Sequence, residues 1–431
     1  MKFLIILKKE LKDLITLSTL AGLAVALIMF LLLGNFISSV NEDMVKEKNV
    51  VAFADKDNTL LSNQIINSLK TSGVDIRLIN GADDFELMER AKEQGQNSYT
   101  IIEKGFEEKF SANKQCDIRI VNKIESFSMT STISSGMSAN IAQMIKESLS
   151  DIIIAKSDIS PNTEFVKNPV NIIDTTISKG KSQNVSSALL SSFAMQQTIF
   201  VPIIVFLLIT FATQMTISTI ANEKGDKTLE TLLSAPVSRL SVLMAKMCAA
   251  GLLSLLMAGV FMFGFSRYMG GMMGGALPSE QMSDVSLALN SLGLNLGVFD
   301  YVLVGIQLFL TILIALGFST VLGAISKDLK SAQGLVGIIM VMAMVPYFIT
   351  MFSDVNMLPI VPKVLISLIP FTHTFTATGN LIFGNYTMFF GGMIYQVIAL
   401  IIVLGFAVKI FSSDLIFTMT LDLSAKRRKK S

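Results

Sequence analysis

The stretch YVLVGIQLFLTILIALGFSTVLGAIS, residues 301–326, carries no charged side chain. A helix needs about 20 consecutive apolar residues to cross the hydrocarbon core of a bilayer, and a buried helix of a water-soluble protein rarely stays uncharged for so long. The stretch therefore predicts a transmembrane helix. Further charge-free stretches follow the same pattern at residues 14–41, 185–222, 247–266, 331–353 and 374–408.

These stretches predict an α-helical polytopic membrane protein. The composition agrees, because charged residues make up 16% of the chain, against about 25% in an average soluble domain. The predicted transmembrane helices, one followed by five, lie at residues 14–36, 197–220, 243–266, 301–325, 332–353 and 387–408. The first is longer than the roughly 7–15 apolar residues of a signal peptide, so we expect it to remain attached as an anchor.

The basic residues predict the orientation in the membrane. They gather before the first span, between the second and third, between the fourth and fifth, and at 426–430, whereas the short loops on the other side carry only Arg267 and Lys363. Basic residues are enriched in cytoplasmic loops. We therefore predict a multi-pass protein of the cell membrane with a cytoplasmic N-terminal segment at 1–13 and a basic cytoplasmic tail at 409–431.

Residues 37–196 hold most of the acidic side chains and predict a small extracytoplasmic α/β domain inserted between the first and second spans. Strands are expected at 50–54, 74–79, 99–102 and 118–121, and helices at 61–69, 83–94 and 106–110. Strands that alternate with helices are typical of α/β domains. Residues 127–156 are expected to be helical, and 157–187, with two prolines and Gly180, to form a loop or an irregular helix.

Residues 221–239, ANEKGDKTLETLLSAPVSR, follow the second predicted span. Leu229, Leu232 and Leu233 share one helical face at i, i+3 and i+4, and Pro236 ends the helix. An amphipathic helix of this kind either lies along the membrane surface or docks on a partner protein. The residues by themselves leave both possibilities open.

The same segment resembles the cytoplasmic signature of ABC-2-type transporter permeases, E-K-x-x-x-T-L-E-x-L-L-x-x-P-V-S-R. The matching residues are Glu223, Lys224, Thr228, Leu229, Glu230, Leu232, Leu233, Pro236, Val237, Ser238 and Arg239. Residues 326–333 resemble the family's short cytoplasmic turn, and 369–385 its external re-entrant element, which we expect near 355–385. The layout of one plus five spans with a large external domain is similar to that of sodium- and drug-efflux permeases.

The resemblance implies a permease subunit of an exporter, with residues 221–242 as a coupling helix that seats in a groove of a separate ABC ATPase. It implies a docking ridge of Leu229, Leu232 and Leu233. Its polar rim would be Glu223, Glu230 and Arg239, although Arg239 has a second interpretation as a basic anchor of the third span. The resemblance also implies a second permease copy, and a substrate such as sodium, a drug-like amphiphile, a peptide or a lipid-linked molecule.

No chemistry is expected on this chain itself. The sequence lacks the phosphate-binding pattern G-x-x-x-x-G-K-[ST], so we place ATP and Mg on the ATPase and predict no cofactor here. It also lacks a metal-ligand spacing such as C-x-x-C. We predict no catalytic residue, no metal site and no nucleic-acid partner.

Two stripes of uncharged polar residues lie within the spans. Thr210, Thr213, Gln214 and Ser218 fall on the second span, and Gln307 and Thr311 on the fourth. Such stripes either hold helices together by hydrogen bonds or line a transport pathway. A rival hypothesis for the whole chain is a membrane-anchored receptor or scaffold whose external domain binds a ligand or partner without transport.

Overall fold

The computed structural model describes residues 50–112, 114–129, 140–150, 169–226, 249–260, 279–326 and 328–412, together with Ser241, Ala245 and Met247. The chain divides into two compact units. The sheet unit comprises Ile37–Thr198 and Gly274–Asn295, and the membrane unit comprises Met1–Phe36, Ile199–Met273 and Leu296–Ser431. The sheet unit is therefore not confined to the predicted 37–196, because it also takes in 274–295 with helix α11 (Ser279–Leu292).

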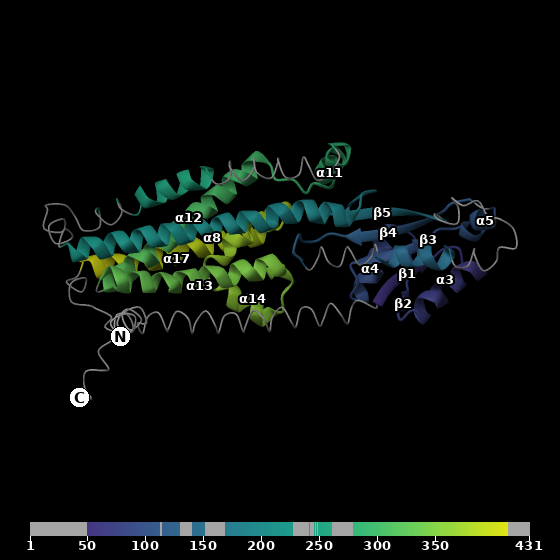
Figure 1. Ribbon diagram of the computed structural model, residues 1–431, viewed down its shortest axis with the longest axis horizontal. Coiled ribbons are helices and arrows are strands. Elements are labelled where there is room, and N and C mark those ends of the chain that lie inside the picture. Colours follow the sequence, from purple (N-terminus) through teal and green to yellow (C-terminus); the bar gives the residue numbers. More distant parts are fainter. Residues whose placement is uncertain are drawn as a thin grey trace, which may run out of the picture. The chain divides into compact units, whose positions relative to one another are not determined.

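The sheet unit is built on a mixed six-stranded sheet in the order β2-β1-β3-β4-β5-β6. Its strands are β1 (Val50–Asp55), β2 (Asp75–Leu78), β3 (Ser98–Ile102), β4 (Cys116–Lys123), β5 (Val170–Ser178) and β6 (Lys181–Gln183) (Figure 1). β1 pairs in parallel with both β2 and β3, β4 is antiparallel to β3, and β5 is parallel to β4. A tight turn closes the β5–β6 hairpin, with Lys179 and Gly180 both at positive φ, the backbone that two-residue hairpin loops require.

Helices cover both faces of this sheet. The helices are α3 (Leu60–Thr71), α4 (Asp84–Glu93) and α5 (Phe106–Ser111). Alternate residues of β1 point to opposite faces: Val51 and Phe53 share a core with Ile65 of α3, whereas Ala52 and Ala54 share one with Leu87 of α4. The predicted alternation of strands and helices between 50 and 121 is thus confirmed element by element.

The prediction of a loop or irregular helix over residues 157–187 is wrong for its described part. Residues 170–178 form β5, which aligns with β4 over eight residue pairs, and 181–183 form β6. The prolines and glycine suggested a break, but Pro169 stands just before the strand and Gly180 lies in the hairpin turn. Between them the sequence VNIIDTTIS is rich in β-branched residues, which favour strands. Residues 151–168 lie outside the described residues.

Long apolar helices form most of the described part of the membrane unit. They are α8 (Ser187–Gly225), α12 (Val298–Ile325), α13 (Leu329–Phe352) and α17 (Tyr386–Ser412). Four segments of these helices, Val201–Gly225, Val298–Ile325, Leu329–Phe352 and Tyr386–Ile410, are long and apolar enough to cross a membrane. They coincide with four predicted spans. The predicted span 14–36 lies outside the described residues, and 243–266 is described mainly as the shorter apolar helix Ala249–Val260.

Helix α12 packs against both α13 and α17 (Figure 1). Ile312, Ala315 and Leu316 of α12 are fully buried in a core shared with α8, α13 and α17. The backbones of α12 and α17 approach closely at Gly317, where an added Cβ would lie 2.5 Å from Cγ1 of Val403. Close approach at small residues is a common packing mode of membrane helices.

Between α13 and α17 the chain forms a run of short helices. They are the 3-10 turn η1 (Val355–Met357), α14 (Ile360–Ser367), α15 (Thr372–Phe375) and α16 (Ala377–Ile382). This broken structure occupies the range 355–385 in which a re-entrant element is expected. Which side of the membrane it faces remains a prediction.

Candidate functional site

Two of the residues that match the family signature lie at the end of α8. These are Glu223 and Lys224, in the last turn of the helix. The other matching residues, Thr228, Leu229, Glu230, Leu232, Leu233, Pro236, Val237, Ser238 and Arg239, lie outside the described residues. The Nζ atom of Lys224 donates hydrogen bonds to the carbonyl oxygens of Ala324, at 2.7 Å, and Ser326, at 3.1 Å.

The polar stripe of α8 does not form a single surface. Thr213 is fully buried, and its hydroxyl has no hydrogen-bond partner among the described residues. Thr210 and Ser218 are half-buried, and the Thr210 hydroxyl donates to the Phe206 carbonyl of its own helix at 2.9 Å. Gln214 alone is exposed, near the middle of the apolar segment. The pathway-lining role of these four residues stays a prediction, and Gln214 is the one among them with an exposed side chain.

The polar stripe of α12 is completely buried and belongs to a larger group. Gln307 and Thr311 lie beside Thr374 of α15 and Gln396 of α17, and we call these four side chains the polar cluster. The Gln396 Nε2 atom lies 2.7 Å from the Thr311 hydroxyl, 2.8 Å from the Pro370 carbonyl oxygen and 2.9 Å from the Thr374 hydroxyl, so its two N–H groups are shared among three acceptors. The Thr311 and Thr374 hydroxyls also bond to each other, and Gln307 Nε2 donates to the His373 carbonyl at 3.0 Å.

The polar cluster therefore fastens the segment 370–374 to two transmembrane helices. His373 adds to this contact, because its ring lies 5.0 Å from that of Tyr395 and an added Cβ at Gly392 would come within 2.7 Å of its Nδ1 atom. The Tyr395 hydroxyl donates to the Leu368 carbonyl at 2.6 Å, and His373 Nε2 lies 3.0 Å from the Ser367 carbonyl. His373 is thus a hydrogen-bonded residue on the short helix α15.

Sequence reasoning missed Gln396 and Thr374 as partners of Gln307 and Thr311. One signal was present, since Gln396 is the only amide, acidic or basic side chain between residues 386 and 408. A lone amide in a transmembrane helix has few partners other than a neighbouring helix. Its partners could not be read from the sequence, because Thr311 lies 85 residues away.

The chemistry available in the polar cluster is neutral hydrogen bonding. Buried Oε1 atoms of Gln307 and Gln396 have no partner among the described residues, and such an acceptor costs about 1–3 kcal/mol. Across the same residues, no group of three His, Cys, Asp or Glu side chains is placed to hold a metal ion. The polar cluster therefore suits a structural role, in which it holds residues 370–374 against α12 and α17, better than a catalytic role.

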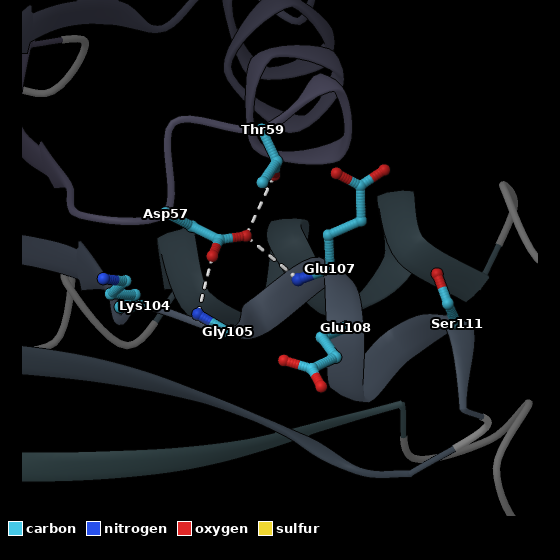
Figure 2. Close-up of a pocket in the computed structure, with 7 residues that line it drawn as sticks. All are labelled: Asp57, Thr59, Lys104, Gly105, Glu107, Glu108 and Ser111. Carbon is cyan, nitrogen blue, oxygen red and sulfur yellow. Dashed lines mark hydrogen bonds between the residues drawn. The ribbon is translucent and has the colours of Figure 1, made fainter.

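The sheet unit has a shallow polar pocket on its surface, lined by Asp57, Thr59, Lys104, Gly105, Glu107, Glu108 and Ser111 (Figure 2). The Asp57 carboxylate accepts hydrogen bonds from the backbone N–H groups of Gly105, at 2.6 Å, Phe106, at 3.2 Å, and Glu107, at 3.0 Å. The Thr59 hydroxyl donates a further one at 2.9 Å. The carboxylate thus caps the free N–H groups that begin α5, and its oxygens are already occupied.

This cap predicts a local dependence on pH. Burial tends to raise the pKa of Asp57, but the hydrogen bonds from residue 107, Thr59 and residues 105 and 106 outweigh it and leave the pKa below the ordinary value of 3.8. Because the folded pKa is depressed, the stabilisation is present above the ordinary value and is lost as the pH falls through the lowered one. We expect hydrogen exchange at residues 105–107, normalised to residues 52–54 of β1, to lose protection at that acidic pH.

Asp57→Asn provides the control for this prediction. The amide keeps the shape of the side chain but has no acidic group, so the protection at residues 105–107 should be lower at neutral pH and no longer change with acidification. A wild-type pH profile in this variant would show that another group governs α5.

Comparisons with known proteins identify the family of the chain. The family model described as "ABC-2 family transporter protein" matches residues 16–409. Among solved structures, a crystal structure of a domain attributed to an ABC type-2 transporter of Thermotoga maritima MSB8 is 20% identical in sequence. The match covers 34% of this chain and 98% of that one, with a TM-score of 0.29. No curated protein matches the chain.

Proposed function

Because the chain belongs to the ABC-2 family of transporters, we propose that it works as the permease subunit of an exporter powered by a separate ABC ATPase chain. The observation that carries this proposal is the match to the family over residues 16–409, which includes the segment 223–239. ABC-2 permeases are non-catalytic membrane components. Substrate classes compatible with the resemblance are sodium, a drug-like amphiphile, a peptide or a lipid-linked molecule.

In this proposal the coupling segment transmits the conformational change of the ATPase to the transmembrane helices. In this proposal the ridge of Leu229, Leu232 and Leu233 seats in a groove of the ATPase, in the manner of an amphipathic helix in an apolar groove. The position of the segment supports this role. The signature begins at Glu223, in the last turn of α8, and continues beyond the end of that helix at Gly225.

A second copy of the chain is part of the proposal. Gln214 is exposed near the middle of an apolar helix, and an amide facing hydrocarbon has no hydrogen-bond partners. We therefore place a second copy or a hydrated pathway against this face, with Thr210 and Ser218 on its flanks. The Gln307 and Thr311 side chains are buried within the protomer. We therefore assign them to the polar cluster that holds residues 370–374 rather than to the pathway.

The test is retention of an ATPase by the purified permease. The full chain is solubilised in detergent together with a candidate P-loop ATPase of its host, and the wild type is compared with Leu232→Asp/Leu233→Asp. We expect the wild type to retain the ATPase and the variant to lose it, because two carboxylates on the ridge cannot be buried without partners.

A matched control carries two leucine-to-aspartate substitutions in the sheet unit. Leu60 and Leu78 are 79% and 56% exposed, so Leu60→Asp/Leu78→Asp adds the same charge without touching the ridge, and it should retain the ATPase. Equal retention by the ridge variant would contradict the coupling role. Absence of any ATPase from the wild type would favour an anchored receptor or scaffold.

A further inference from the structure

Lys224 belongs to the predicted coupling segment, but its side chain is engaged inside the membrane unit. Its ammonium lies 2.7 Å from the carbonyl oxygen of Ala324 and 3.1 Å from that of Ser326. Ala324 is in the last turn of α12, and Ser326 is the residue that follows the helix. The contact joins residues about a hundred positions apart in the sequence.

These carbonyls are the ones that need a donor. The last carbonyl groups of an α-helix have no partner within the helix. At the end of α12, the Ser326 hydroxyl and backbone N–H both donate to Gly323, at 2.6 and 3.3 Å. The carbonyls of Ala324 and Ser326 are supplied by Lys224, and a cation near a helix C-terminus is also favoured by the helix dipole.

The two helices are closely packed beside this contact. A Cβ added at Gly323 would lie 3.1 Å from the Cβ of Ile220 and 3.5 Å from the Cα of Ile217. Both isoleucines are buried. The backbone of α12 therefore fits directly against α8 just before the coupling segment begins.

We propose that Lys224 is a positioning residue that ties the start of the coupling segment to the cytoplasmic end of α12, and that it does not dock on the ATPase. This inference rests on the proposed function for its transport consequence. A displacement of the coupling segment would move the end of α12 with that of α8.

Helix α12 connects the Lys224 contact to the polar cluster. Thr311, in the polar cluster, lies 13 residues before Ala324 on the same helix, a distance of about 20 Å at 1.5 Å per residue. The same rigid element thus holds the tie at one point and the segment 370–374 at the other, through Gln396 and Thr374. A displacement of the coupling segment is therefore transmitted along α12 to the polar cluster.

The first measurement needs no ATPase. In a Cys116→Ala/Cys248→Ala background, Ile220→Cys and Gly323→Cys put two Cβ atoms 3.1 Å apart. A slight separation of the two helices brings them to the roughly 3.5–4.5 Å between the Cβ atoms of a disulfide. We expect rapid disulfide formation in detergent, slower formation when Lys224→Met is added, and recovery with Lys224→Arg. An unchanged rate with Lys224→Met would overturn the tie.

The second measurement separates positioning from docking. The Lys224→Met permease should retain the ATPase as the wild type does, while losing permease-dependent stimulation of ATP hydrolysis. Loss of the ATPase itself would mean that Lys224 docks on the partner, and would overturn the inference. If even the wild type retains no ATPase, the proposed function fails, and the disulfide rate still decides whether the tie exists.

Discussion

Replacing Gly317 with alanine is expected to destabilise the packing of α12 against α17 by about 1–3 kcal/mol, the usual cost of overpacking a tight core. The new Cβ would lie 2.5 Å from Cγ1 of Val403 and 3.8 Å from the end of Met247. Val403 cannot easily move away, because it is buried and its branched side chain has few allowed rotamers. The helices must separate, and the thermal unfolding temperature in detergent should fall.

A control on the same helix isolates this clash from helix propensity. Gly305→Ala adds the same methyl group to α12 where nothing lies within 4 Å, so it should leave stability unchanged or slightly raise it, since alanine favours helix over glycine. In Gly317→Ala/Val403→Ala the obstructing methyl group is removed, and most of the lost stability should return. Equal behaviour of Gly317→Ala and Gly305→Ala would show that the two helices are not in close contact at this point.

Replacing Gln396 with leucine is expected to release the segment 370–374 from α12 and α17. Leucine has a similar size, so the change removes hydrogen bonds without opening a large cavity. The Thr311 and Thr374 hydroxyls can still bond to each other, but the Pro370 carbonyl loses the donor that lies at 2.8 Å in the wild type. An unsatisfied buried acceptor costs about 1–3 kcal/mol. Loss of the unpartnered Gln396 Oε1 offsets this cost in the total stability, so the expected effect is local to residues 370–374.

Hydrogen exchange of residues 369–376 in the detergent-solubilised chain measures this release directly. We expect faster exchange there in Gln396→Leu, with little change in the sheet unit. Gln214→Leu is the matched control, because it makes the same exchange in a transmembrane helix at an exposed side chain, and it should leave residues 369–376 protected. Wild-type protection in Gln396→Leu would mean that the polar cluster does not hold this segment.

The short helices between α13 and α17 explain why these two changes are the most informative. Gly317 sets the distance between α12 and α17, and Gln396 fastens residues 370–374 to both. The two variants therefore test the packing that holds residues 370–374 against α12 and α17.

Membrane insertion, four apolar spans and most of the sheet unit could be predicted from the sequence. A bilayer acts on local composition, since each spanning segment must satisfy its own backbone and carry apolar side chains. The alternation of strands and helices from Val50 to Val121 likewise follows from the short-range periodicity of apolar residues. The signature at 223–239 pointed to the family without any structure.

Pairing between distant segments was decided only by the tertiary structure. β5 was missed because a strand beside β4 is stabilised by a partner about fifty residues away, and local breakers suggested a loop. Thr213 and Gln214 are neighbours in sequence, yet one is fully buried and the other exposed. Lys224 matches the family signature, but its acceptors at the end of α12 could not be read from the sequence. Hydrogen bonding and burial depend on which segments meet, whereas hydrophobicity along a single span does not.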